Sequence, residues 1–204
     1  MTGAVIAFSL ASALIVLLPG PDTLVVVRSL VRTGRRGAAL TAAGVLSGAM
    51  VWVVGAALGI SALLRASHDA YLVLRVVGGA YLVWLGVQSL RARGIPLHDD
   101  VPAGRRGLLG RGFGAGLATD LLNPKVGVFF VTFLPGFVPA GEPVGRTTLL
   151  FGTIFVVESA AYFAVLLLLA RRVTAWMARP VVRRRLERVT GVVLVGLGAR
   201  LVSQ

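Results

Sequence analysis

Two short proline-containing segments interrupt long apolar stretches of this chain, and they constrain its fold more than any other feature. The first spans residues 19–22 (Pro-Gly-Pro-Asp) and the second spans residues 123–125 (Asn-Pro-Lys). Each follows a pair of leucines, and their first residues lie 104 positions apart. Proline removes a backbone donor and clashes with the preceding turn, so each segment predicts a helix that breaks or kinks.

The composition places these apolar stretches in a membrane. Of the 204 residues, 56% are hydrophobic and only 14% are charged, and the mean hydropathy is +0.87. A soluble all-helical protein is excluded because too little polar surface remains to cover its core. We therefore expect an integral membrane protein in contact with membrane lipids. No basic segment precedes the first apolar stretch, so we expect a membrane helix there rather than a cleaved signal peptide.

The formal net charge of +13 comes from 21 Lys and Arg residues against 8 Asp and Glu residues. The basic residues cluster in short segments between apolar stretches, which indicates membrane topology and lipid headgroups rather than a nucleic-acid partner. The chain has no cysteine, which excludes disulfides, dithiol redox chemistry and thiolate metal sites. We expect no cofactor.

The apolar stretches predict six membrane helices, at residues 3–27, 37–64, 70–90, 112–134, 147–170 and 186–202. The sixth is short for a bilayer core of about 30 Å, so Arg188 and Arg200 would have to reach the interfaces from its ends. Three connecting segments are rich in arginine, whereas the other two carry only Arg65 and Arg146. The positive-inside rule therefore predicts that the three rich segments are cytoplasmic and that both termini lie outside.

The two halves of the chain also resemble each other beyond the two breaks. Glycines recur at the same offset, and the third and sixth stretches share a pattern. The matched positions are Gly37 with Gly141, Gly48 with Gly152, residues 75–78 with 188–191, and residues 82–86 with 194–198. Chance matching of abundant Leu, Val and Gly is the alternative. A repeat of three spans must insert its second copy upside down, an arrangement typical of transporters.

The fold class that follows is all-α. We expect one membrane transporter domain over residues 1–204, a polytopic protein with six transmembrane helices built as two inverted three-helix repeats, in which helices 1 and 4 are broken. Repeat one would cover residues 1–93 and repeat two residues 111–204, with a cytoplasmic loop at 94–110. We interpret His98 in this loop and His68 in an outer turn as solvated loop residues rather than ligands.

Few ionisable side chains lie within the predicted spans. A charge at the centre of a membrane helix costs about 2.5–3.5 kcal/mol, so such residues are candidates for function. Arg75 and Arg200 lie near span ends and are set aside. The others are Asp22, Asp120, Lys125 and Glu158.

These residues allow a structural and a functional interpretation. Asp22 and Asn123 could simply cap restarting helices, and Lys125 with Glu158 could form a buried structural ion pair. Alternatively, Lys125 and the free N–H groups of the restarted helices suit a carboxylate, whereas Asp22 and Glu158 suit an ammonium group. That combination fits a zwitterionic amino acid, and a carboxyl group that takes up a proton would allow proton coupling. The candidate substrate-binding residues are Pro19, Gly20, Pro21, Asp22, Asn123, Pro124 and Lys125, and the candidates for proton coupling are Glu158 and Asp120.

Three motifs in this order resemble the lysine-exporter/homoserine–threonine-exporter superfamily of small amino acid efflux proteins. They are residues 19–22, residues 74–90 with Gly78, Tyr81, Leu82 and Gly86, and residues 123–125 followed by Phe129-Phe130 and Leu134-Pro135. The resemblance covers nearly the full length. It implies six spans, a plasma (inner) membrane location, export of an amino acid or derivative driven by the proton gradient, and a substrate site at the two broken helices. Gly136 and Asp120 depart from the family pattern.

Other function classes remain as alternatives. An intramembrane serine protease would need a histidine within a span, and both histidines lie in predicted loops. A divalent-metal or other small-ion exporter or channel is allowed by the acidic residues, although Lys125 argues against a cation pathway. The sequence leaves open which amino acid is moved, which ion is coupled, and whether the protein forms a homo-oligomer.

Overall fold

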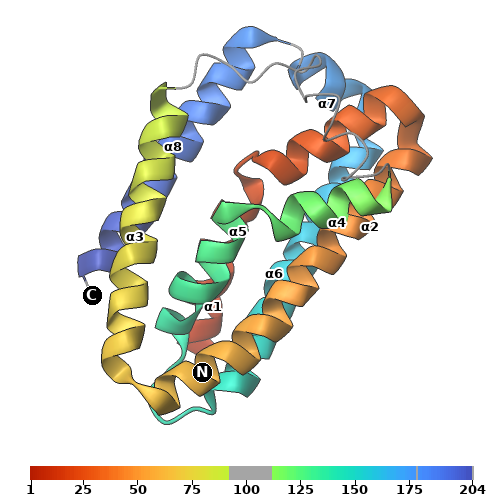
Figure 1. Cartoon of the computed structure of the whole chain (residues 1–204). Helices are drawn as coiled ribbons and strands as arrows, with labels where there is room; N and C mark the ends of the chain where they lie inside the picture. Colours follow the sequence, from red (N-terminus) through yellow and green to blue (C-terminus); the bar gives the residue numbers. More distant parts are fainter. Residues whose placement is uncertain (92–111, 178, 204) are drawn as a thin grey trace.

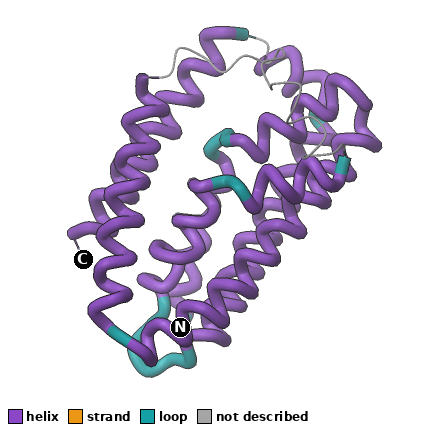
Figure 2. Tube along the Cα trace, in the orientation of Figure 1, coloured by secondary structure: helices purple, strands orange, loops and turns teal. Residues whose placement is uncertain are grey.

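The computed structural model describes residues 1–91, 112–177 and 179–203. Within these ranges every regular element is a helix (Figure 2). The predicted cytoplasmic loop at 94–110, with His98, lies outside the described residues. The elements are α1 (Thr2–Leu17), α2 (Pro21–Ala66), α3 (His68–Arg91), α4 (Phe113–Leu121), α5 (Pro124–Val128), the π-helix η2 (Phe129–Phe133), the 3₁₀-helix η3 (Leu134–Phe137), α6 (Val144–Leu168), α7 (Ala170–Met177) and α8 (Pro180–Ser203).

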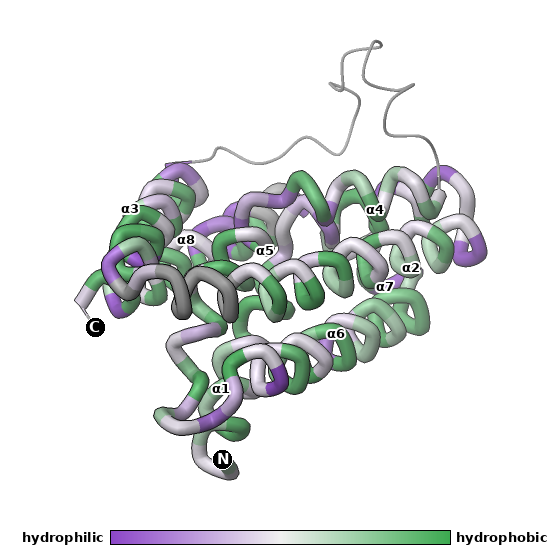
Figure 3. Tube along the Cα trace, turned by 60° about the horizontal axis from the view of Figure 1, so that its bottom comes forward, coloured by the Kyte–Doolittle hydropathy of each residue, from purple (hydrophilic) through white to green (hydrophobic). Residues whose placement is uncertain are grey.

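Three described helices are long and apolar enough to cross a membrane, at Pro21–Gly59, Asp69–Arg91 and Val144–Leu168. The helices on either side of the second break, bent by 51° at the break, would make a fourth span if taken together. Helix α1 has only 16 residues, about 24 Å of rise, which is less than a bilayer core. In Figure 3 the apolar character of α6 extends along most of its length. The structure therefore supports an all-helical chain with three to four candidate spans among the described residues.

The arginine-rich segment expected as a loop between the first two spans is helical instead. Helix α2 runs through it, and only Gly34 departs from helical geometry, with φ at +72° and ψ at −169°. A positive φ is strained for a residue with a Cβ atom, so glycine allows the turn there. We call residues 21–33 the first arm of α2 and residues 35–66 its second arm. Figure 1 shows that the two arms run in different directions.

Two other boundaries differ from the prediction. The last helix begins at Pro180 rather than near residue 186, and the arginines at 171 and 172 lie in the separate helix α7. After the second break the chain is α-helical only to Val128, and it then continues as η2 and η3. Proline at position 135 cannot donate a backbone hydrogen bond, so it belongs to the tighter last turn.

Helices α3 and α8, which correspond in the predicted repeat, pack side by side and run antiparallel (Figure 1). Glycines form the contact. A Cβ atom on Gly86 would lie 2.7 Å from the carbonyl oxygen of Gly191, and one on Gly79 would lie 2.9 Å from that of Gly198. Small residues let membrane helices approach until their backbones touch, and contacts between the backbones then hold the pair together.

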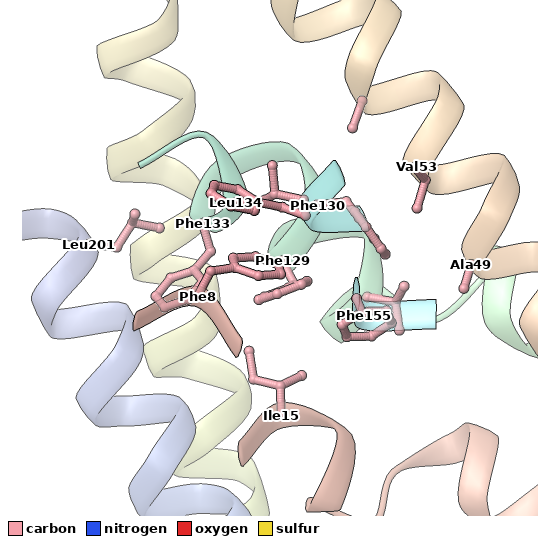
Figure 4. Close-up of a cluster of buried hydrophobic side chains, with 13 residues drawn as sticks. Phe8, Ile15, Ala49, Val53, Phe129, Phe130, Phe133, Leu134, Phe155 and Leu201 are labelled. Atoms are coloured by element: carbon pink, nitrogen blue, oxygen red, sulfur yellow. The ribbon is translucent and has the colours of Figure 1, made fainter. Parts of the chain in front are cut away.

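A cluster of aromatic side chains joins α1 to α6 and to the segment after the second break (Figure 4). Phe8 on α1 stacks on Phe151 of α6 with ring centroids 4.6 Å apart, and its ring also lies 5.9 Å from that of Phe129. Phe8 and Phe129 are almost completely buried. Close packing of such large rings fixes the position of α1 relative to η2, and so brings the two breaks together.

Candidate functional site

The two helix breaks lie next to each other in the structure. Helix α1 ends at Leu17 and α2 begins at Pro21, whereas α4 ends at Leu121 and α5 begins at Pro124. The broken helices run antiparallel, because their contacts pair Phe8 with Phe137, Ile15 with Lys125, and Asp22 with Asn123. Sequence positions that are far apart thus meet at one place.

Asn123 connects the two breaks directly. Its Oδ1 atom accepts a hydrogen bond from the backbone N–H of Lys125 at 3.1 Å, which caps the N-terminus of α5. Its Nδ2 atom donates to Oδ2 of Asp22 in the first turn of α2, at 2.5 Å. The side chain is 2% exposed. Asn123 is therefore both a helix cap, as its structural interpretation predicted, and a link to Asp22.

Lys125 closes the other side of this junction. Its ammonium group donates to the carbonyl oxygens of Ile15, at 3.1 Å, and Leu18, at 3.0 Å. These carbonyls belong to the end of α1, where the regular helical hydrogen bonds to the residue four positions on are missing and the helix dipole is negative. A Cβ atom on Gly20 would lie 3.4 Å from Nζ, so the glycine leaves room for the ammonium group.

A cavity of about 30 Å³ adjoins this junction. Gly20, Asp22, Asp120 and Lys125 line it, together with apolar side chains of α1, α2 and α6. The free space holds a few water molecules at most, so a whole amino acid requires the site to widen. Pro19, Pro21, Asn123 and Pro124 do not line the cavity; the prolines shape the breaks, and Asn123 holds Asp22.

Asp120 is a buried part of the cavity wall, with an exposed fraction of 1%. Its Oδ2 atom has no hydrogen-bond partner among the described residues, and the same is true of Oδ1 of Asp22. Gly48 on the second arm of α2 makes room for this carboxyl group, because a Cβ there would lie 2.7 Å from Oδ2. Trp52 donates from its indole N–H to the backbone carbonyl of Asp120, at 3.3 Å.

Glu158 lies outside the cavity wall. Its Oε2 atom accepts a hydrogen bond of 2.5 Å from the hydroxyl of Ser12 on α1. Lys125 and Glu158 thus have different partners in the described part of the chain, and the buried ion pair considered from the sequence does not form. The second carboxylate at the cavity is Asp120, not Glu158.

Sequence reasoning missed several polar side chains around the cavity. Ser159 and Tyr162 of α6 line it, and the Tyr162 hydroxyl lies 3.4 Å from that of Thr23. The sequence signal that could have found them is their position on the same predicted helix as Glu158: Ser159 follows Glu158 directly, and Tyr162 lies about one helical turn later. Among residues 1–91, 112–177 and 179–203, no group of three His, Cys, Asp or Glu side chains could hold a metal ion.

The chain is similar to a family of known transport proteins over almost its full length. The family described as LysE type translocator matches residues 13–204. A homoserine/homoserine lactone efflux protein of Salmonella typhi is 32% identical over 198 residues, which cover 97% of this chain and 95% of the relative. A threonine efflux protein of Escherichia coli K12 is 32% identical over 195 residues, or 90% of each chain. No solved structure matches.

An uncharacterized membrane protein of Bacillus subtilis is 26% identical over 196 residues, or 93% of each chain. The family match covers far more than half of the chain, and two relatives exceed 30% identity over nine tenths of it. The chain therefore belongs to the LysE type translocator family, and it is a multi-pass membrane protein from a family of transporters rather than enzymes.

Proposed function

We propose that the protein is a secondary transporter that exports an amino acid or an amino acid derivative across the plasma membrane by proton antiport. The observation that carries this proposal is the meeting of the two breaks at a cavity lined by Asp22, Asp120 and Lys125. Irregular backbone inside a bilayer is tolerated where it is buried or faces a wet cavity, and charged groups there are typical of substrate pathways.

The architecture that we propose has six spans in two inverted repeats, residues 1–93 and 111–204, with both termini outside. The first span would join α1 to the first arm of α2, and the fourth would join α4 to α5, η2 and η3. Two observations support the repeat: the broken helices run antiparallel, and the corresponding helices α3 and α8 pair through glycines. Inverted repeats of this kind surround a site near the middle of the membrane.

The substrate class follows from the charges at the junction. Lys125 and the N-termini of the restarted helices suit a carboxylate, and the carboxylates that line the cavity suit an ammonium group. The relatives from Salmonella and Escherichia coli are named for homoserine, its lactone and threonine. We propose a small amino acid or derivative of similar size as the cargo, bound at the cavity where the breaks at residues 19–22 and 123–125 meet. Glu158 or Asp120 would carry the coupling proton.

The experiment that tests this function is counterflow in proteoliposomes. The purified protein is reconstituted, the vesicles are loaded with one amino acid from a panel, and uptake of the labelled compound is followed with and without a pH gradient. Exchange of a small amino acid, accelerated by the gradient, is the expected result. The ion-exporter alternative predicts instead that divalent metal ions compete for the flux and that amino acids do not.

Lys125→Ala tests the site within the same assay. The substitution leaves the carbonyls of Ile15 and Leu18 without their cation, so we expect exchange to be lost. Arg146→Ala, an exposed cation outside the cavity wall, is the matched control. Size-exclusion chromatography in detergent checks that both variants are folded. Undiminished exchange by a folded Lys125→Ala variant would remove Lys125 from the substrate site.

A further inference from the structure

Two acidic side chains line the cavity: Asn123 holds the carboxylate of Asp22, and Trp52 holds the backbone of Asp120. Asn123 binds Oδ2 of Asp22, which leaves Oδ1 buried with no partner among the described residues. The backbone of Asp120 is bound by the indole of Trp52, and its Oδ2 atom is likewise buried and unpartnered. A buried carboxylate oxygen without a partner is costly, whereas an ionic hydrogen bond to it is strong. Each carboxylate thus has one oxygen in place for a hydrogen-bond donor.

The ammonium group of Lys125, unlike these carboxyl oxygens, already has hydrogen-bond partners. Lys125 already donates to the carbonyl oxygens of Ile15 and Leu18, at 3.1 and 3.0 Å, so two of its three donors are engaged. The described lining residues thus offer a ligand two unpartnered carboxyl oxygens and only one remaining ammonium donor.

We propose that Asp22 and Asp120 form an ammonium-binding subsite, and that the protein selects its cargo by a free amino group and tolerates loss of the cargo's carboxylate. This inference rests on the proposed function, since it assigns the part of an amino acid that the transporter reads. Within the proposed class of amino acids and their derivatives, it predicts that carboxyl-blocked compounds, such as amides, are accepted when they keep a primary ammonium group. A compound with a carboxylate but no amino group would be rejected, because the two buried oxygens would stay unpartnered.

The test uses three forms of one compound with the reconstituted full-length protein. The amino acid that gives the fastest counterflow, with threonine and homoserine tried first, is compared with its carboxamide and its N-acetyl derivative as unlabelled competitors. The carboxamide keeps the ammonium group, and the N-acetyl compound keeps the carboxylate. We expect the carboxamide to compete within about threefold of the parent, because Lys125 keeps its carbonyl partners. The N-acetyl compound should be weaker by about 10–100-fold, the effect of one lost ionic hydrogen bond.

Substitutions of the two carboxylates then test whether Asp22 and Asp120 cause the preference for a free amino group. Asp22→Asn and Asp120→Asn should each weaken competition by the parent and the carboxamide to a similar degree, and Asp69→Asn, an exposed acid in the first turn of α3, should leave both unchanged. Because Asp120 is buried and its variant could fail to fold, the comparison of the three compounds on the unaltered protein stands by itself.

The outcomes separate this inference from the proposed function. If the N-acetyl compound competes as well as the parent and the carboxamide does not, amino acid transport stands and the ammonium subsite is wrong. If Asp22→Asn and Asp120→Asn both fold and compete normally, the subsite is likewise wrong. If no amino acid exchanges at all in the unaltered protein, the proposed function fails and this inference fails with it.

Discussion

Asn123 donates a hydrogen bond from Nδ2 to Oδ2 of Asp22, and this contact joins the two helix breaks across 101 positions of sequence. The same amide accepts from the backbone of Lys125 through its oxygen, so it is held at both ends. One side chain thus fixes the start of α5 and the orientation of a cavity carboxylate. The ammonium group of Lys125 ties the end of α1 to the same place.

We expect Asn123→Ala to destabilise the protein and to abolish transport. The variant loses a helix cap, worth about 1 kcal/mol, and leaves Asp22 with two unpartnered oxygens, at a cost of about 1–3 kcal/mol. Thermal unfolding in detergent and counterflow measure the two effects. Asn123→Ser retains a capping oxygen but is too short to keep the link, so it isolates the Asp22 contact. Full transport by the serine variant would show that the link is dispensable.

Gly48→Ala should impair transport because of one methyl group. The new Cβ atom would lie 2.7 Å from Oδ2 and 2.8 Å from Cβ of Asp120, so the carboxyl group must move. Gly55 lies on the same arm of α2 with nothing within 4 Å of a Cβ atom, and Gly55→Ala is the matched control. Alanine favours a helix over glycine by up to about 1 kcal/mol, so both variants should remain helical. Equal counterflow by the two variants would contradict a role for the position of Asp120.

Glu158→Gln should separate exchange from proton coupling. Glutamine keeps the size of the side chain and its contact with Ser12 but cannot release or take up a proton. If Glu158 carries the coupled proton, counterflow without a gradient continues, and export driven by a pH gradient falls to the rate measured without one. Unchanged acceleration by the gradient would exclude Glu158 and leave Asp120 as the remaining candidate. Ser12→Ala, which keeps the carboxyl group, should retain coupling.

Gly86→Ala should loosen the pair formed by α3 and α8. The added Cβ atom would lie 2.7 Å from both the carbonyl oxygen of Gly191 and a methyl group of Val195, so the helices must separate. Overpacking of this kind costs about 1–3 kcal/mol. Gly196 on α8 has nothing within 4 Å of a Cβ atom, and Gly196→Ala is the control. The melting temperature in detergent should fall for the first variant and stay within error for the second.

The sequence alone predicted the breaks and the apolar helices between them, because proline and hydropathy act locally. It also predicted that the breaks form one site, because the offset between them implied a repeat. The sequence also grouped Glu158 with Lys125, whereas in the structure Lys125 lines the cavity and Glu158 does not. Glu158 faces Ser12, while its neighbour Ser159 faces the cavity. Adjacent residues on a helix point in different directions, so the rotation of α6 about its axis decides which of the two side chains reaches the cavity. Packing against the neighbouring helices sets that rotation, and the local sequence does not reveal it.

The turn at Gly34 also escaped prediction. Four arginines close together between two apolar stretches suggested a loop, yet arginine has a high helix propensity and the helix continues on both sides of one glycine. Nothing in the segment other than that glycine marks the turn. The start of α8 at Pro180 has a similar cause, since its charged first turns do not look like a membrane span.

Cysteine labelling measures whether the two breaks enclose a polar chamber that the substrate enters. The chain has no native cysteine, so single substitutions report without background. Ser159→Cys places a thiol in the cavity wall, and Val157→Cys places one on an exposed, apolar position of the same helix. A charged thiol reagent added to proteoliposomes needs a thiolate and water, which lipid excludes. We predict that Ser159→Cys is labelled, that the transported amino acid slows its labelling, and that Val157→Cys stays unlabelled. Labelling of Val157→Cys alone, or labelling of Ser159→Cys that no amino acid slows, would show that the substrate does not enter a chamber between the breaks.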